Sequence, residues 1–177
     1  MDGVASILDD KHFAKVEDLW EEFKEKFGVH GIAKTPVPHF SYHVAKSYDR
    51  EHLEKFFRRM VKEIEPFTVT TNGLGIFTGA EFPVLYIPVI RNYELTTFHN
   101  RMWQAVSEWA QDTSAYYHPD NWRPHITLTH HDVSHELLPE VVGLLSKRSF
   151  NWKIRVENIA LISGGDDVHN VKFKIPL

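Results

Sequence analysis

The chain has 177 residues, of which 42% are hydrophobic and 25% charged, which suits one folded domain or two small lobes that share a core. The absence of cysteine excludes disulfides, thiolate metal sites and cysteine nucleophiles. The net charge of −4 disfavours long duplex nucleic acid as a partner, because proteins that bind many phosphates carry a basic surplus.

No apolar run approaches the roughly 18 residues that are needed to span a bilayer. The starting segment MDGVASILDD is acidic, and its apolar run is too short for a signal peptide. We therefore expect a cytoplasmic protein that makes no contact with a membrane.

In chain order, the first half predicts a strand, a helix, a strand, a helix and two strands, at residues 3–8, 11–27, 39–45, 49–65, 67–77 and 84–90. The first helix has apolar residues along one face and ends at Gly28, and the second ends before Pro66. The loop GIAKTPVP precedes the second strand. The turn-like segment TGAEFP indicates a hairpin between the last two strands.

The second half predicts a helix, a strand, a helix and two strands, at residues 95–110, 123–130, 136–145, 152–162 and 171–175, with the turn SGGDD before the last strand. Both halves therefore run helix, histidine-bearing strand, helix and two strands, and the first half has an extra strand at its start. No linker rich in Ser or Gly separates them. The pattern indicates an internal duplication and not a tandem of independent domains.

Two similar stretches, PHFSYHVA and PHITLTHH, occupy equivalent places in the two halves. Because side chains alternate along a strand, His39 and Ser41 share one face of the first strand, and His125 and Thr127 share one face of the second. If a pseudo-two-fold axis relates the halves, the two polar pairs face each other across a groove. A single His-x-hydroxyl motif has little meaning, so the matched placement of two copies is the informative observation.

Two imidazoles on opposite sides of one phosphorus atom can act as general base and general acid near neutral pH. The hydroxyls of Ser41 and Thr127 can donate hydrogen bonds to the non-bridging phosphate oxygens, where the transition state carries its charge. Such a site needs no metal ion and no covalent intermediate. The sequence does not assign the base and the acid between His39 and His125.

The motifs His39-Phe40-Ser41-Tyr42 and His125-Ile126-Thr127-Leu128 resemble the signature of the 2H phosphoesterase superfamily, also called the LigT-like or 2′-5′ RNA ligase-like family. The resemblance implies an enzyme without a cofactor, acting on a nucleotide or RNA end that carries a 2′,3′-cyclic phosphate or a 2′-5′ linkage. It implies that His39 and His125 are catalytic and that Ser41 and Thr127 bind the phosphate. Many RNA-processing members have an Arg shortly after the second motif, where this chain has Thr129 and His130.

The resemblance also implies an α+β fold over residues 1–177, with a central groove between two pseudo-symmetric lobes at about 1–92 and 93–177. We expect each lobe to have an antiparallel sheet and two outer helices. The sequence leaves the oligomeric state open.

Three other interpretations remain. The protein could be a module that binds an RNA end or a nucleotide with little turnover, or a scaffold without a site. It could also be a metal hydrolase that uses the histidines near His130, although strand alternation predicts that His131 shares the face of His125 while His130 points away, and no zinc-binding helix motif is present. We interpret this segment, with His135, as a solvated strand end.

Several residues near the motifs have two readings. His43 either lines the groove or is buried, and its equivalent in the second half is Thr129. Tyr116, Tyr117, Trp122 and Arg123 precede the second motif, and we favour loop packing for them over contact with a nucleobase.

Overall fold

The computed structural model describes residues 1–30, 37–164 and 171–177, and it confirms the α+β class. Most of the predicted loop GIAKTPVP and of the predicted turn SGGDD lies outside the described residues. The helices are α1 (Asp10–Phe27), α2 (Arg50–Met60), α3 (Tyr93–Val106) and α4 (Leu138–Leu145). None of these described helices is long and apolar enough to cross a membrane.

Most strands belong to one seven-stranded antiparallel sheet with the order β11-β10-β1-β2-β8-β6-β5. In chain order its members are β1 (Asp2–Ile7), β2 (His39–Ala45), β5 (Gly75–Phe77), β6 (Val84–Pro88), β8 (His125–Thr127), β10 (Asn158–Ser163) and β11 (Val171–Pro176). Two small ribbons pair β3 (Ser47–Tyr48) with β7 (Ala110–Gln111), and β4 (Phe67–Thr70) with β9 (Lys153–Val156).

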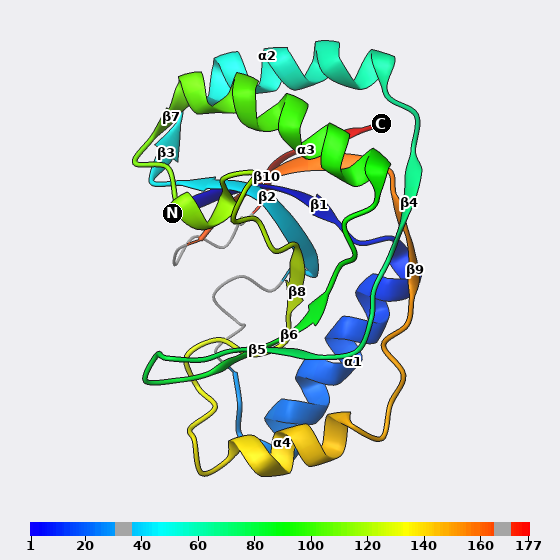
Figure 1. Cartoon of the computed structure of the whole chain (residues 1–177), viewed down its shortest axis with the longest axis vertical. Helices are drawn as coiled ribbons and strands as arrows, with labels where there is room; N and C mark the ends of the chain where they lie inside the picture. Colours follow the sequence, from blue (N-terminus) through cyan, green and yellow to red (C-terminus); the bar gives the residue numbers. More distant parts are fainter. Residues whose placement is uncertain (31–36, 165–170) are drawn as a thin grey trace.

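The two halves of the chain interleave in this sheet. β2 from the first half pairs with β8 from the second half, and β1 pairs with β10 from the second half. Figure 1 shows the same mixing in the helices, because α2 and α3 lie together at one end of the molecule and α1 and α4 at the other. The expectation of a separate sheet in each lobe is therefore wrong, because strand periodicity predicts the buried face but not the neighbouring strand. The assignment of residues 1–177 to one domain stays a prediction.

The starts of α1, α2 and α3 follow the capping rules. Asp9, Asp49 and Asn92 each precede a helix, and each side chain accepts a hydrogen bond from the backbone N–H three residues later. The first helix ends at Gly28, whose φ of +67° is the left-handed conformation that glycine adopts without strain. The predicted stop at Gly28 is confirmed.

Several predicted strands are shorter or divided. Residues 67–77 form two strands, β4 and β5, in different sheets, and a turn with Gly73 at φ +66° separates them. Residues 152–162 divide into β9 and β10 at Glu157. The predicted hairpin is present as β5–β6. The second motif strand contains only three residues, His125–Thr127, instead of the predicted 123–130.

The core of the protein lies between the helices and one face of the large sheet. Phe40 and Ile126, the middle residues of the two motifs, point into it and are fully buried. Tyr42 is also buried there, with its ring edge against that of Phe98 on α3. Because side chains alternate along a strand, this packing leaves the polar residues of both motifs on the opposite face of the sheet.

Candidate active site

The four polar residues of the motifs lie side by side at the centre of the large sheet. β2 and β8 pair through the middle residue of each motif, and antiparallel register then places His39 opposite Thr127 and Ser41 opposite His125. Directly opposed side chains in such a pair have Cβ atoms about 4.5–5.5 Å apart. Each imidazole is therefore next to the hydroxyl of the other motif. The two pairs share one sheet, whereas the sequence suggested that they face each other across a groove.

All four side chains line one cavity of about 1230 Å³. Its wall also contains two cations, Arg91 and Arg123, and two carboxylates, Asp2 and Asp120. The charged side chains of the described lining residues, apart from the imidazoles, therefore balance. Tyr116, whose side chain is 82% exposed, lies at the same cavity.

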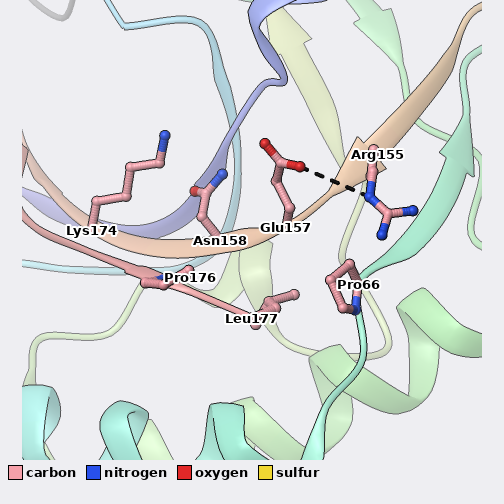
Figure 2. Close-up of a pocket in the computed structure, with 7 residues that line it drawn as sticks. All are labelled: Pro66, Arg155, Glu157, Asn158, Lys174, Pro176 and Leu177. Atoms are coloured by element: carbon pink, nitrogen blue, oxygen red, sulfur yellow. Dashed lines mark ion pairs between the residues drawn. The ribbon is translucent and has the colours of Figure 1, made fainter.

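A second hollow of about 450 Å³ lies beside the last strand, and Figure 2 shows the residues that line it. Arg155 and Glu157 form an ion pair there at 3.9 Å. The side-chain amide of Asn158 is already bonded to the backbone N–H and carbonyl of Ile7. None of the described residues that line this hollow is a histidine, so we take the larger cavity as the candidate active site.

The two histidines are oriented by the same contact. Nδ1 of His39 lies 2.5 Å from the Val37 carbonyl, and Nδ1 of His125 lies 2.7 Å from the Arg123 carbonyl. A carbonyl only accepts, so each Nδ1 carries a proton and donates it. In the neutral ring the lone pair is then on Nε2. In both motifs the residue between the carbonyl and the histidine is proline, whose fixed φ restricts this short segment.

Both histidines have a pKa below the ordinary value of 6.5. Burial lowers the pKa of His39, the hydrogen bond to Val37 raises it, and the nearby charge of His125 lowers it again. Burial also lowers the pKa of His125, against the opposite effect of the hydrogen bond to Arg123. Because protonation of one ring disfavours protonation of the other, an intermediate pH range exists in which one ring is charged and the other neutral.

An aromatic pair supports His125. The rings of Phe77 and Tyr86 stack with centroids 4.1 Å apart, and the ring of His125 packs edgewise on them at 4.9 Å and 5.3 Å. The Tyr86 ring occupies the space over Gly75, where an added Cβ would lie 2.2 Å from Tyr86 Cζ. Glycine is therefore required at this position if the pair is to keep its contact with His125.

His43 does not line the cavity, because β2 contains a bulge. The register with β1 shifts so that Tyr42 is an extra residue between Ser41 and His43. Alternation is reset at this point, and Val44 takes the place on the cavity face that strict alternation gives to His43. His43 is fully buried. Of the two readings of His43, the structure therefore has the buried one.

The hydrogen bonds of His43 define its protonation. Ser107 Oγ donates to the Trp103 carbonyl at 2.7 Å, so Oγ can only accept from His43 Nε2, which lies 3.3 Å away. Nε2 therefore carries the proton, and Nδ1 accepts from the Tyr48 hydroxyl at 2.6 Å. Burial lowers the pKa of His43 to about 4, in agreement with a neutral ring. His43 is therefore a buried structural residue that links β2 to Tyr48 and Ser107.

Thr129, the equivalent of His43 in the second half, is also fully buried, and its Oγ1 accepts a hydrogen bond from the Leu85 N–H at 3.0 Å. The next residue, His130, lines the cavity, so the prediction that it points away is wrong. The backbone N–H groups of Leu128 and Thr129 both donate to the Leu85 carbonyl. In a regular strand consecutive N–H groups point to opposite sides, so the alternation of side chains ends at Thr127.

The remaining histidines of this segment, His131 and His135, are exposed, as is His130. The rings of His130 and His131 contact each other with centroids 4.1 Å apart. Within residues 1–30, 37–164 and 171–177, no group of three or more His, Asp or Glu side chains is placed to hold a metal ion.

The residues before the second motif were expected either to pack within their loop or to contact a nucleobase. Trp122 is 2% exposed and packs as predicted for loop packing, and it also borders the cavity. Arg123, Tyr116 and Tyr117 line the cavity. Arg91 also lines it and was missed, because it follows β6 in a segment where no motif draws attention to it.

Comparison with known families agrees with the geometry. The model of the 2′-5′ RNA ligase superfamily matches residues 9–168. The chain therefore belongs to this family, which is the 2H phosphoesterase superfamily that its two motifs resemble. Its members have phosphoesterase or ligase activity. A search of curated proteins found no match.

Proposed function

We propose that the protein is a metal-independent phosphoesterase that hydrolyses, or ligates across, 2′,3′-cyclic phosphates or 2′-5′ phosphodiester bonds of nucleotides or short RNA ends. One of His39 and His125 is the general base and the other is the general acid, and Ser41 and Thr127 bind the phosphate. The observation that carries this proposal is the register of β2 and β8, which brings two imidazoles and two hydroxyls together in one cavity.

The proposed reaction transfers two protons. The neutral imidazole takes a proton from water through Nε2 while the water oxygen forms a bond to phosphorus. The bond between phosphorus and one ribose oxygen breaks, and the imidazolium donates its proton to that oxygen. Ser41 and Thr127 donate hydrogen bonds to the non-bridging oxygens. In ligation the same steps run in reverse, so the two histidines exchange roles.

The charge of the cavity supports a small substrate. Among the described lining residues the side chains of Arg91 and Arg123 are offset by those of Asp2 and Asp120, so these side chains do not provide the surplus of cations that a long polyanion requires. A single phosphodiester at the end of a nucleotide or a short RNA fits this balance better than a duplex does.

A substrate screen in excess chelator tests the proposal. We expect turnover of adenosine 2′,3′-cyclic phosphate, of RNA with a cyclic end or of a 2′-5′ dinucleotide, measured by separation of the products. Binding without turnover by any of these would support a binding module instead. Activity that chelator abolishes would support a metal hydrolase and contradict the two-histidine mechanism.

The pH dependence of kcat/KM is expected to be bell-shaped. At low pH both imidazoles are protonated and no base is available, whereas at high pH both are neutral and no acid is available. Because the pKa values of His39 and His125 are both lowered, the maximum is expected below the ordinary histidine value of 6.5. A rate profile measured from pH 4 to 9 that is flat, or rises steadily, contradicts this mechanism.

Tyr116→Ala is expected to raise KM. An exposed aromatic ring at a nucleotide site can stack on a base, and such stacking contributes about 1–3 kcal/mol, so KM should rise roughly 5- to 150-fold with little change in kcat. The matched control is Tyr93→Ala, since Tyr93 is also 82% exposed but does not line the cavity. Equal KM values for the two variants would show that Tyr116 makes no contact with the substrate.

A further inference from the structure

The junction between β2 and β8 carries the whole candidate site, yet it is short. Within the described residues the two strands register through one residue pair, Phe40 with Ile126. The backbone of Pro124 contributes nothing to this junction, because it faces the β6 side, where its carbonyl accepts a hydrogen bond from the Val89 N–H at 2.9 Å. The relative placement of the two motifs therefore needs another contact.

Trp122 supplies such a contact. Its indole Nε1–H donates to the backbone carbonyl of Ser41 at 2.9 Å. Trp122 lies three residues before His125, so this one hydrogen bond joins the approach to the second motif directly to a phosphate-binding residue of the first. The side chain is 2% exposed and cannot reorient freely.

Two neighbours hold the indole in place. The ring of His99 stacks on it with centroids 3.7 Å apart and planes at 10°. His99 Nε2–H in turn donates to the Tyr42 carbonyl at 3.0 Å, so the stack is itself fixed to β2. The Arg91 guanidinium lies 5.6 Å from the Trp122 ring centroid, and its Nη1 donates to the Trp122 carbonyl at 3.3 Å.

This arrangement does not depend on pH near neutrality. Burial lowers the pKa of His99 to about 4, so its ring is neutral when it stacks on the indole. The contacts of Trp122 are therefore those of a permanent support.

We infer that Trp122 is a positioning residue, whose indole N–H ties the segment before β8 to the backbone of β2 and fixes Ser41 relative to His125. The inference rests on the proposed function, in which Ser41 binds the phosphate. It assigns to Trp122 no contact with the reacting atoms.

Trp122→Phe tests this role, because it keeps an aromatic ring for the stack and removes the donor. With adenosine 2′,3′-cyclic phosphate we expect kcat to fall roughly 3- to 10-fold, the effect of one lost hydrogen bond, with KM within about twofold of wild type. The control is Trp152→Phe, since Trp152 is also buried but packs against Phe150 and His12 away from the cavity. Unchanged kcat in Trp122→Phe would overturn the inference.

A double-mutant cycle separates positioning from a general loss of structure. If Trp122 acts through Ser41, adding Trp122→Phe to Ser41→Ala should lower kcat by less than about twofold further. Effects that multiply in full would overturn the inference. If Trp122→Phe does not fold, His99→Phe takes its place, because it preserves the stack and removes the bond to the Tyr42 carbonyl.

Wild-type protein without turnover would contradict the proposed function and not this inference. The same cycle can then be measured on the Kd of adenosine 2′-monophosphate by calorimetry. Non-additive losses of affinity for Trp122→Phe and Ser41→Ala would support the positioning role, and additive losses would overturn it.

Discussion

Replacing either His39 or His125 with alanine is expected to lower kcat by roughly 10²–10⁴-fold, because each variant lacks one of the two proton-transfer groups. Both side chains lie on the cavity face of the sheet, half-buried and outside the core, so the free energy of unfolding should change little. Steady-state rates on the best substrate of the screen, together with urea unfolding, measure both quantities.

The control for these variants is His135→Ala, which removes an exposed imidazole that does not line the cavity. It should leave kcat within about twofold of wild type, since it removes no group from the cavity. A loss of less than tenfold in both His39→Ala and His125→Ala would contradict acid/base catalysis by this pair.

Ser41→Ala and Thr127→Val are each expected to lower kcat by about 10²–10³-fold, the usual effect of removing one donor to the charge of a transition state. Thr127→Val preserves the branched shape that packs in a strand. KM should change little, because the donated bonds strengthen as charge develops on the phosphate oxygens. Steady-state kinetics on the same substrate separate the two constants.

A second threonine in the same segment provides the contrast. Thr129→Val should leave kcat per folded molecule nearly unchanged but cost roughly 1–3 kcal/mol of unfolding free energy, because the Leu85 N–H then loses its buried acceptor. Thr68→Val, at an exposed position of β4, controls for the change of residue type. If Thr127→Val resembles Thr129→Val, losing stability and not kcat, Thr127 has no role in phosphate binding.

The local parts of the candidate site could be predicted from the sequence. A spacing of two residues in a strand is enough to place His39 beside Ser41 and His125 beside Thr127 on one face, because alternation depends only on the backbone of that strand. The helix ends at Gly28 and the helix starts at the capping residues could also be predicted, because they depend on residues within one turn of the helix end.

The non-local parts could not be predicted. Nothing in the spacing indicates that β2 and β8 are neighbours in one sheet, since pairing depends on the whole topology. The bulge at Tyr42 arises from the register with β1, and it decides that His43 is buried while Val44 lines the cavity. The early end of β8, which turns His130 towards the cavity, depends on a contact with Leu85 in another strand.

The interleaving of the chain halves has a consequence for the order of folding. The cavity floor forms only when β2, near the start of the chain, pairs with β8, which follows α3. Contacts between residues so distant in sequence require closure of a long loop and form slowly compared with helices and hairpins. We therefore expect this floor to assemble late in folding, and a nascent chain that ends before β8 carries His39 and Ser41 without the partners that face them.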